Sequence, residues 1–412
     1  MRRSVVVTGA AALTPLGSLD ETWCALLAGR SRVEAVRLAG NGHAVPGARS
    51  DLELDAVPDA RLRRPLGRAG MLAVAAALAA WRDAGLAGAN ADAAGAVLAS
   101  PAPDLQLDLL HPAFLAARQN GHFDTGGFAR ELRRTVPPHW RLGQVPNVIG
   151  HALAALLKIR GPQLTVASAC ASGADAIGLA ARMIEEGRVE IALAGGADNL
   201  LFAPAHALLR RFDLLSADHG PAQPFDRRRR GLVPGEGAAV LVLESAESAA
   251  ARGAAVLGRF LGYGAATVPP AAADAQAGAE GFARAMSAAL RDAALAAEDV
   301  GGLFAYAPGT LTGDREESLA IRQLFGTAVR VTSTKGGIGY LGAASGAVDA
   351  ALALRALQGR VIPPVANLTE PDELCPVACV AGEAAAHPRA AALCNTHGLG
   401  GQYASLVLGR AA

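Results

Sequence analysis

The residue with the clearest chemical potential is Cys170, which lies in the small-residue run Ser168–Gly173 (SACASG). A thiol attacks substrates as its thiolate, and the free amides and dipole at a helix N-terminus stabilise that anion. The preceding segment, Leu164–Ala167, is predicted to be a buried strand, and Ala174–Glu186 has helical spacing. We therefore predict a strand-to-helix turn that projects the sulfur, similar to the nucleophile elbow of hydrolases. The alternative is a small core cysteine without chemistry.

The other four cysteines are Cys24, Cys375, Cys379 and Cys394. An odd total of five argues against a disulfide framework and favours a reducing compartment. Cys375 and Cys379 are spaced like a metal-binding pair, but no second pair or histidine cluster follows at ligand spacing. No metal site is therefore expected.

The composition excludes several classes of function. The chain has 412 residues, of which 51% are hydrophobic and 18% charged, which predicts a well-buried globular core. A net charge of +1 gives no support for a nucleic-acid or membrane-surface role. No apolar stretch is long enough for a membrane span or a signal sequence, so we expect a soluble, cytoplasmic protein. The basic run Arg227–Arg230 is interpreted as an ion-paired loop or as a docking site for an acidic partner.

Strand and helix patterns alternate along the chain, as is typical of layered α/β proteins. Ser4–Thr8 is predicted to be a strand, Ala10–Gly17 a loop, and residues 101–146 an irregular insertion that shapes a pocket or a dimer contact. The second half repeats the order of elements of the first from about residue 250, which suggests an internal duplication.

Further motifs accompany the cysteine. They are VVVTGAAALTPLG near the N-terminus, Gly195–Asp198 (GGAD), Phe212–Glu244 with its PFD and GEG triplets, and Asn395–Gly401 (NTHGLGG). Together these motifs resemble the β-ketoacyl synthase family over nearly the whole chain. The resemblance implies an α/β, thiolase-like five-layer αβαβα fold of two duplicated halves, here residues 1–248, which carry the cysteine, and residues 249–412. It also implies a dimer.

The resemblance further implies how the site works. Cys170 would accept an acyl chain from an acyl carrier protein, and the backbone amides of Cys170 and Leu399 would form the oxyanion hole. The phosphopantetheine arm arrives on the carrier protein, so no cofactor of the chain's own is expected. Thr310, Thr396, His397 and Leu399 are expected to contact the substrate, with His397 standing where the family usually has phenylalanine.

The chain departs from the family pattern at two histidines. The segments that should carry them read Tyr306–Thr310 (YAPGT) and Lys335–Tyr340 (KGGIGY), so tyrosine stands at both positions while Lys335 is kept. A phenol donates a hydrogen bond, but with a pKa of about 10 it is a poor base at neutral pH. Losing an oxyanion donor typically costs about 2.7–4 kcal/mol of transition-state stabilisation. Tyr306, Tyr340, Lys335 and Cys170 are thus the candidate catalytic residues of a degenerate site.

Three hypotheses about function remain open. The chain could form a thioester on Cys170 and condense it in an atypical way, or it could pass acyl chains on without elongating them. It could also be a subunit similar to a chain length factor, which shapes the pocket of a complete ketosynthase in a heterodimer. The intact surroundings of Cys170 favour an acylated cysteine, and the two tyrosines favour a non-condensing role in fatty acid or polyketide biosynthesis.

Overall fold

The chain is built around one long path of hydrogen-bonded strands. The computed structural model describes residues 2–38, 44–51, 56–88, 91–99, 107–119, 122–216, 220–269 and 275–411. The strands follow the order β13-β12-β16-β17-β11-β1-β10-β9-β5-β8. The first half contributes β1 (Val5–Thr14), β5 (Ala94–Ala99), β8 (Gln163–Val166), β9 (Ile191–Asn199) and β10 (Glu236–Ser245). The second half contributes β11 (Gly258–Thr267), β12 (Val300–Phe304), β13 (Arg330–Thr332), β16 (Ala391–Gly398) and β17 (Gln402–Gly409).

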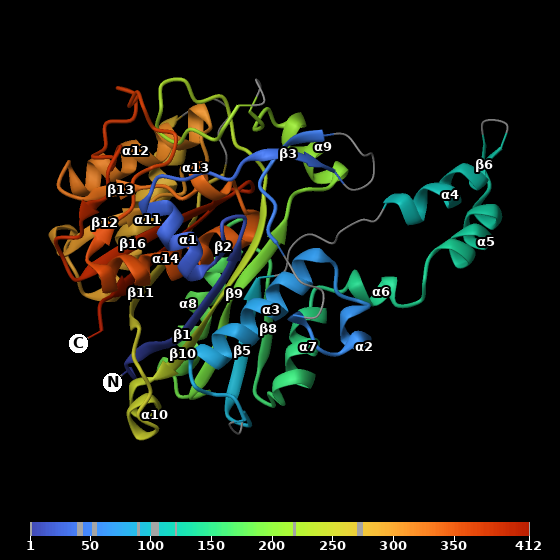
Figure 1. The fold of residues 1–412 in the computed structure, drawn as a ribbon, viewed down its shortest axis with the longest axis horizontal. Helices are drawn as coiled ribbons and strands as arrows, with labels where there is room; N and C mark the ends of the chain where they lie inside the picture. The colour runs from blue at the N-terminus through green and yellow to red at the C-terminus, as the bar shows by residue number, and fades with distance from the viewer. Residues whose placement is uncertain are drawn as a thin grey trace.

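Helices cover and separate the two groups of strands (Figure 1). On the outer face of the first group lie α3 (Arg68–Asp83) and α7 (Val148–Leu157). Between the groups lie α8 (Ser172–Glu185) and α14 (Ser345–Gly359), and the outer face of the second group is covered by α11 (Ala275–Ala293) and α12 (Leu311–Phe325). The arrangement is the predicted five-layer α/β fold. The two groups join where β1 pairs with β11 over Val5–Val7.

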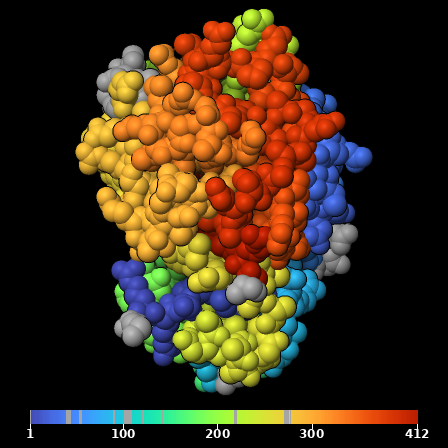
Figure 2. Space-filling model, turned by 90° about the vertical axis from the view of Figure 1, so that its left-hand side faces the viewer, coloured from blue at the N-terminus to red at the C-terminus, as the bar shows by residue number. Residues whose placement is uncertain are grey.

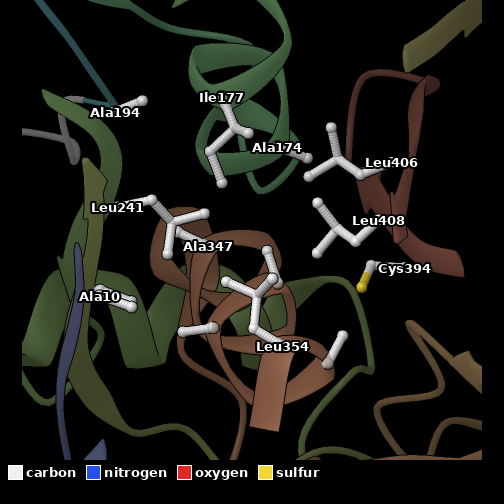
Figure 3. Packing of buried hydrophobic residues seen from close by; sticks show 14 of the residues in the cluster. Ala10, Ala174, Ile177, Ala194, Leu241, Ala347, Leu354, Cys394, Leu406 and Leu408 are labelled. Carbon is white, nitrogen blue, oxygen red and sulfur yellow. The ribbon is translucent and has the colours of Figure 1, made fainter. Parts of the chain in front are cut away.

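The middle layer is held together by small and branched apolar side chains. Figure 3 shows Ala174 and Ile177 of α8 and Leu354 of α14 in the same cluster as Leu406 and Leu408 of β17. All five are buried. Alanine-rich helices bring their backbones close to both neighbouring sheets, so this helix pair fits between them with a continuous apolar contact.

The segment Ala10–Gly17, predicted to be a loop, is largely strand. β1 continues to Thr14 and pairs with β10 from Ala10 to Leu13, after a register shift between Val7 and Gly9. A Cβ atom at Gly9 would lie 2.4 Å from the carbonyl oxygen of Ala80, so the glycine lets α3 approach the sheet. The prediction was wrong because small residues that pack against a helix resemble a loop in composition.

The strand β8 is not buried as predicted. It pairs with β5 and ends the strand path, and Gln163, Leu164 and Thr165 are exposed, with Leu164 at 44%. Its apolar composition indicated a central strand, but the structure leaves it at an open sheet edge. An open edge of this kind is a template for pairing with another chain.

The segment predicted to be an irregular insertion contains helices in its described part. These are α4 (Leu107–Ala117), α5 (Thr125–Thr135) and α6 (Trp140–Gly143), with β6 (Arg118–Gln119) and β7 (His122–Phe123) between the first two. Figure 1 shows α4, β6 and α5 projecting away from the rest of the molecule. We call residues 107–119 and 122–135 the arm. Phe114, Phe123 and Phe128 form an aromatic cluster on it, with Phe114 50% and Phe123 54% exposed.

The remaining elements connect these layers. They are α1 (Leu19–Leu27), α2 (Ala60–Arg63), α9 (Ala203–Arg211), α10 (Ala246–Ala251), α13 (Lys335–Ile338) and the short strands β2 (Gly17–Ser18), β3 (Glu34–Arg37), β4 (Ala44–Gly47), β14 (Val361–Ile362) and β15 (Ala385–Ala386). In the space-filling view of Figure 2, residues of the second half, coloured orange to red, occupy the upper part of the visible face. Within the described residues, no helix has both the length and the apolarity needed to cross a membrane.

Candidate active site

Cys170 lies in a tight turn between β8 and α8. Ala169, just before it, adopts a φ of 51°, in the left-handed region that residues with a Cβ rarely occupy. The Ser172 hydroxyl donates to the carbonyl oxygen of Ala169 at 2.5 Å and accepts from the amide of Ser168 at 2.8 Å. This turn sets Cys170 two residues before the first residue of α8, so the predicted strand-to-helix turn is present.

Cys170 is a partly exposed residue that packs against the apolar cluster of the second half. Burial raises the pKa of its thiol to about 12, the nearby Tyr340 hydroxyl lowers the pKa, and the nearby Asp198 raises it. The direction of this shift opposes the stabilisation of the thiolate that a helix N-terminus provides. Desolvation by the surrounding apolar atoms outweighs the stabilisation of the thiolate.

Tyr306 and Tyr340 come from different segments and meet beside the sulfur. Tyr306 follows β12 and Tyr340 follows α13, and their rings touch edge to face with centroids 5.8 Å apart at 90°. The Tyr340 side chain lies close to both the Tyr306 hydroxyl and the Cys170 thiol, so that these groups affect one another's pKa. Burial raises the pKa of both phenols, so both are protonated and able to donate a hydrogen bond at neutral pH.

His397 lies in an aromatic group behind Tyr306. Its ring is stacked on Tyr403 with centroids 4.4 Å apart at 16°, and it meets Tyr306 edge to face at 5.3 Å. Phe282 contacts all three rings. Burial lowers the pKa of His397 to about 4, so its imidazole is neutral at pH 7. The residue thus lies beside one candidate catalytic tyrosine, as its position in the loop suggested.

The loop that carries Leu399 lies directly over the cysteine turn. A Cβ atom at Gly398 would stand 2.8 Å from the carbonyl oxygen of Ser168 and 3.1 Å from the Cβ of Ala169. Leu399 itself is 41% exposed. Within the described residues, the amides of Cys170 and Leu399 donate no hydrogen bond to another backbone group. Both remain available to a carbonyl oxygen that approaches the sulfur.

Lys335 is buried and engaged by a residue that sequence reasoning missed. Its Nζ donates to the carbonyl oxygen of Ala305 at 2.8 Å and forms an ion pair with Asp349 of α14. Thr334 donates to the other carboxylate oxygen of Asp349 at 2.7 Å. The missed signal was a single carboxylate in the alanine-rich helix Ser345–Gly359, where a charge is tolerated only with a partner.

A second missed residue, Glu317 of α12, holds the backbone that carries Tyr306. Its carboxylate accepts hydrogen bonds from the amides of Tyr306 at 3.0 Å and Ala307 at 2.8 Å, and from Nδ2 of Asn395 at 2.9 Å. Burial raises the pKa of Glu317 to about 7, against the lowering effect of these bonds. Glu317 therefore connects the Tyr306 segment to the strand β16 that leads to His397.

The two candidate threonines are engaged by their neighbours. The hydroxyl of Thr310 accepts from the amide of Gly313 at 3.2 Å and caps α12. The hydroxyl of Thr396 donates to the carbonyl oxygen of Ala404 at 3.4 Å, and the methyl group of Thr396 faces Gly346. Both side chains are buried, so these contacts hold the elements of the site in place.

Three carboxylates near the site have structural contacts. Asp314 accepts from the amides of Phe225 at 2.8 Å and Gly309 at 3.0 Å and so joins the two segments that carry them. Glu236 pairs with Arg68 at 2.6 Å. Asp198 accepts from the amide of Ala343 at 2.8 Å, and burial raises the pKa of Asp198 to about 6.

The basic run Arg227–Arg230 is largely ion-paired, as its first interpretation predicts. Arg227 and Arg228 both contact Glu370, and Arg228 also contacts Asp226. Arg229 is buried and pairs with Asp372 at 2.5 Å. Arg210 of α9, by contrast, lines a cavity of about 300 Å³ together with His206, Val233 and Pro234. The amide of Tyr340 donates to the carbonyl oxygen of Val233, so this cavity adjoins the site's backbone.

Comparison with known proteins assigns the family. Models of the β-ketoacyl synthase N-terminal and C-terminal domains match residues 2–249 and 257–369. A 3-oxoacyl-[acyl-carrier-protein] synthase 2 from Vibrio harveyi is 31% identical over 421 residues, covering 98% of each chain. A solved β-ketoacyl synthase from Burkholderia phymatum is 31% identical with a TM-score of 0.90, and the ishigamide ketosynthase/chain length factor is 30% identical with a TM-score of 0.85. Both solved structures match over 100% of each chain.

Three observations agree with one another. They are the strand-to-helix turn that presents a cysteine, the glycine-containing loop that lies over this turn, and the family matches along almost the whole sequence. The chain belongs to the β-ketoacyl synthase family.

Proposed function

We propose that the protein accepts an acyl group from an acyl carrier protein as a thioester on Cys170 and uses it in acyl transfer or in an atypical condensation. The pathway class is fatty acid or polyketide-type biosynthesis, in keeping with relatives that are named as 3-oxoacyl-[acyl-carrier-protein] and polyketide β-ketoacyl synthases. The observation that carries the proposal is the position of Cys170 in a tight turn under the Gly398–Leu399 loop, with its thiol close to the Tyr340 hydroxyl.

The acylation step follows from this geometry. The sulfur of Cys170 attacks the thioester carbonyl, a new C–S bond forms, and the oxygen becomes an oxyanion that the amides of Cys170 and Leu399 would stabilise. The bond to the pantetheine sulfur then breaks, and the proton of the Cys170 thiol leaves with the pantetheine thiolate as its thiol. We expect the Tyr340 hydroxyl, which is close to the sulfur, to relay this proton.

The tyrosine pair favours transfer over decarboxylation. Decarboxylating a malonyl thioester builds negative charge on the thioester oxygen, which two protonated phenols could only partly offset by hydrogen bonding. His397 has its ring in contact with Tyr306, but this imidazole is neutral at pH 7 and is stacked on Tyr403. We therefore propose that Tyr306 and Tyr340 replace the family's histidines and leave malonyl decarboxylation weak.

The proposed docking surface for the acidic carrier protein is α9. Arg210 and Arg211 are exposed in its last turn, next to the exposed apolar side chains of Leu208 and Phe212. The cavity beside Arg210 is also lined by Val233, whose carbonyl oxygen accepts from the amide of Tyr340. A pantetheine arm entering this cavity would therefore approach the site. The run Arg227–Arg230 is less suitable, since acidic neighbours already engage the guanidinium groups of Arg227, Arg228 and Arg229.

A second candidate function is a non-condensing subunit similar to a chain length factor, paired with a complete ketosynthase. The open edge of β8 and the exposed aromatic side chains of the arm favour a partner chain, because both leave surface that another chain would cover. One solved relative, which is 30% identical, is by its name such an assembly, the ishigamide ketosynthase/chain length factor. The same surfaces also suit a homodimer.

Intact-protein mass spectrometry after incubation with acyl carrier protein thioesters tests the proposal. We expect the mass of one acyl group on the protein, located on the Cys170 peptide, and none on Cys170→Ala. A malonyl decarboxylation assay with the same samples is expected to show little carbon dioxide release. Equal labelling of Cys170→Ala would overturn the catalytic proposal, and activity that appears only when a complete ketosynthase is added would favour the second candidate.

A further inference from the structure

A hydrogen-bond chain links the cysteine turn to the second half of the protein. The Ser168 hydroxyl donates to Oδ2 of Asp175, one turn into α8, and the Tyr263 hydroxyl of β11 donates to Oδ1 of the same carboxylate at 2.8 Å. The amide of Ser168 in turn donates to Ser172, whose hydroxyl is bonded to Ala169. Asp175 thus connects the turn that presents Cys170 to a strand of the other sheet.

Packing against the same face of α8 holds Tyr263 in place. A Cβ atom at Gly178 would lie 2.4 Å from Cγ of Tyr263, so the absence of a side chain there lets the ring lie on the helix. The ring then spans one helical turn from Gly178 to Asp175. The amide of Tyr263 donates to Asp292 of α11 at 2.9 Å, and Arg182 of α8 is paired with the same aspartate. Two carboxylates therefore anchor α8 to the second half.

The proposed function uses neither Asp175 nor Tyr263. Ala169 adopts a backbone conformation that is costly for a residue with a Cβ, and such conformations persist only where the surroundings hold them. The bond from Ser168 to Asp175 ties the start of this turn to the body of α8, in addition to the bond from the Ser168 amide to Ser172 at the first residue of the helix. Without it, the turn could relax and move the sulfur away from the Tyr340 hydroxyl.

We propose that Asp175, held by Tyr263, is a positioning residue that fixes the cysteine turn through Ser168 and so keeps the Cys170 thiol against the Tyr340 hydroxyl. The proposal rests on the proposed function, because it assumes that the reactivity of Cys170 matters. Tyr263, a residue of the second half, thereby has a role at the site that the first half carries.

A double-mutant comparison tests it. The readout is the second-order rate constant for alkylation of Cys170 by iodoacetamide at pH 8, followed on the Cys170 peptide by mass spectrometry. Tyr340→Phe is expected to slow alkylation roughly tenfold in the wild-type background, the effect of losing one hydrogen bond to the thiolate. In the Asp175→Ala background the same change is expected to have no further effect, because the hydrogen bond is already lost.

Ser248→Ala supplies a matched control background. Ser248 donates to the buried carboxylate of Glu244 at 2.8 Å, a bond of the same kind as that from Ser168 to Asp175 but outside the cysteine turn. In this background Tyr340→Phe should keep its full effect. If Asp175→Ala does not fold, Tyr263→Phe carries the same test, since it removes one oxygen atom and the bond to Asp175.

The outcomes separate this inference from the proposed function. If the effect of Tyr340→Phe is equally large in the wild-type, Asp175→Ala and Tyr263→Phe backgrounds, Asp175 does not position the thiol and the inference is overturned. If the carrier protein thioesters leave Cys170 unlabelled in the wild-type protein, the proposed function fails, whatever the alkylation rates show.

Discussion

The hydroxyl of Tyr340 lies against the thiol of Cys170, although the two residues lie 170 positions apart in the sequence. This contact opposes the effect of burial, which alone would raise the pKa of the thiol further. A phenol in this position stabilises the thiolate by donating a hydrogen bond, but it carries no positive charge. The site therefore holds a nucleophile that ionises reluctantly, which leads to measurable consequences.

Alkylation of Cys170 is expected to depend steeply on pH. With a thiol pKa of about 12, the thiolate fraction and hence the rate should rise about tenfold per pH unit from pH 7 to pH 10. An ordinary cysteine, with a pKa near 8.5, would level off above about pH 9. Peptide-resolved iodoacetamide kinetics measure this, with the exposed Cys24 as an internal reference. A plateau for Cys170 below pH 9 would contradict the raised pKa.

Replacing Tyr340 by histidine is expected to lower the pKa of Cys170. An imidazole beside the sulfur can take up its proton and stabilise the thiolate as an ion pair, which a phenol cannot do. We expect Tyr340→His to speed alkylation at pH 8 by at least tenfold, and Tyr340→Phe to slow it. The same samples, assayed for malonyl decarboxylation, show whether one histidine restores any of that activity. A rate for Tyr340→His at or below that of Tyr340→Phe would exclude a pairing role for position 340.

Asp198→Asn should act in the opposite direction to Tyr340→Phe. The Asp198 carboxylate raises the pKa of Cys170, and burial raises the pKa of Asp198 itself to about 6. Above pH 6 the charge is present and disfavours the thiolate, so its removal should speed alkylation severalfold at pH 8. At pH 5 most of the wild-type Asp198 is already protonated, so the two rates should converge. A difference that is the same at pH 5 and pH 8 would exclude the charge of Asp198 as its cause.

The sequence allowed the layers and the cysteine turn to be predicted because each depends on local pattern. The helix predicted over Ala174–Glu186 is observed as Ser172–Glu185, and the strand predicted over Ser4–Thr8 is the first part of β1. The placement of β8 was not predictable, since exposure at a sheet edge depends on which strands pair, and its apolar residues are also typical of a central strand. The contact between Tyr263 and Asp175 was not predictable either, because the two residues lie in different halves of the chain.

The chemistry of the site was predictable only in part. The motifs indicated Cys170, Tyr306, Tyr340 and Lys335, but the raised pKa of the thiol was not predictable, because desolvation depends on the tertiary packing around the sulfur. Asp349 and Glu317 were missed for a related reason. Their roles depend on partners in other elements, Lys335 and the amide of Tyr306, which the spacing of charges along one helix does not reveal.

The ion pair between Lys335 and Asp349 is expected to be needed for folding. Both side chains are buried, so Lys335→Met would leave Asp349 with an uncompensated charge, and breaking such a pair typically costs about 3–5 kcal/mol in the free energy of unfolding. Urea denaturation measures the loss, and the double variant Lys335→Met with Asp349→Leu should recover much of it. As a control, Arg284→Ala breaks the exposed pair with Glu280 and should cost no more than about 0.5 kcal/mol. Equal losses for the single and double variants would argue against the pair.

Carrier protein binding is expected to depend on α9. Reversing the charge at Arg210 and Arg211 to glutamate should weaken binding of an acidic carrier protein by at least tenfold at low salt, since both side chains are exposed beside the cavity near Tyr340. Reversal at Arg227 should have little effect on binding, because Glu370 already pairs with it. Isothermal titration at two salt concentrations measures both. The reverse ranking would place the docking surface at the Arg227–Arg230 run.

The arm and the edge of β8 are expected to be covered by a second chain. Three large apolar side chains are exposed in the single chain: Leu164 of β8 is 44% exposed, and Phe114 and Phe123 of the arm are 50% and 54% exposed. A partner could bury β8 and the arm together. Light scattering should therefore give a dimer for the wild-type protein or for its complex with a ketosynthase. Leu164→Lys combined with Phe123→Asp should give a folded monomer, because both changes place a charge where apolar contact is needed. Leu374→Lys, a change at a comparably exposed leucine outside both elements, is the matched control and should leave the dimer intact. A wild-type protein that stays monomeric with and without a ketosynthase partner would show that these surfaces have another use.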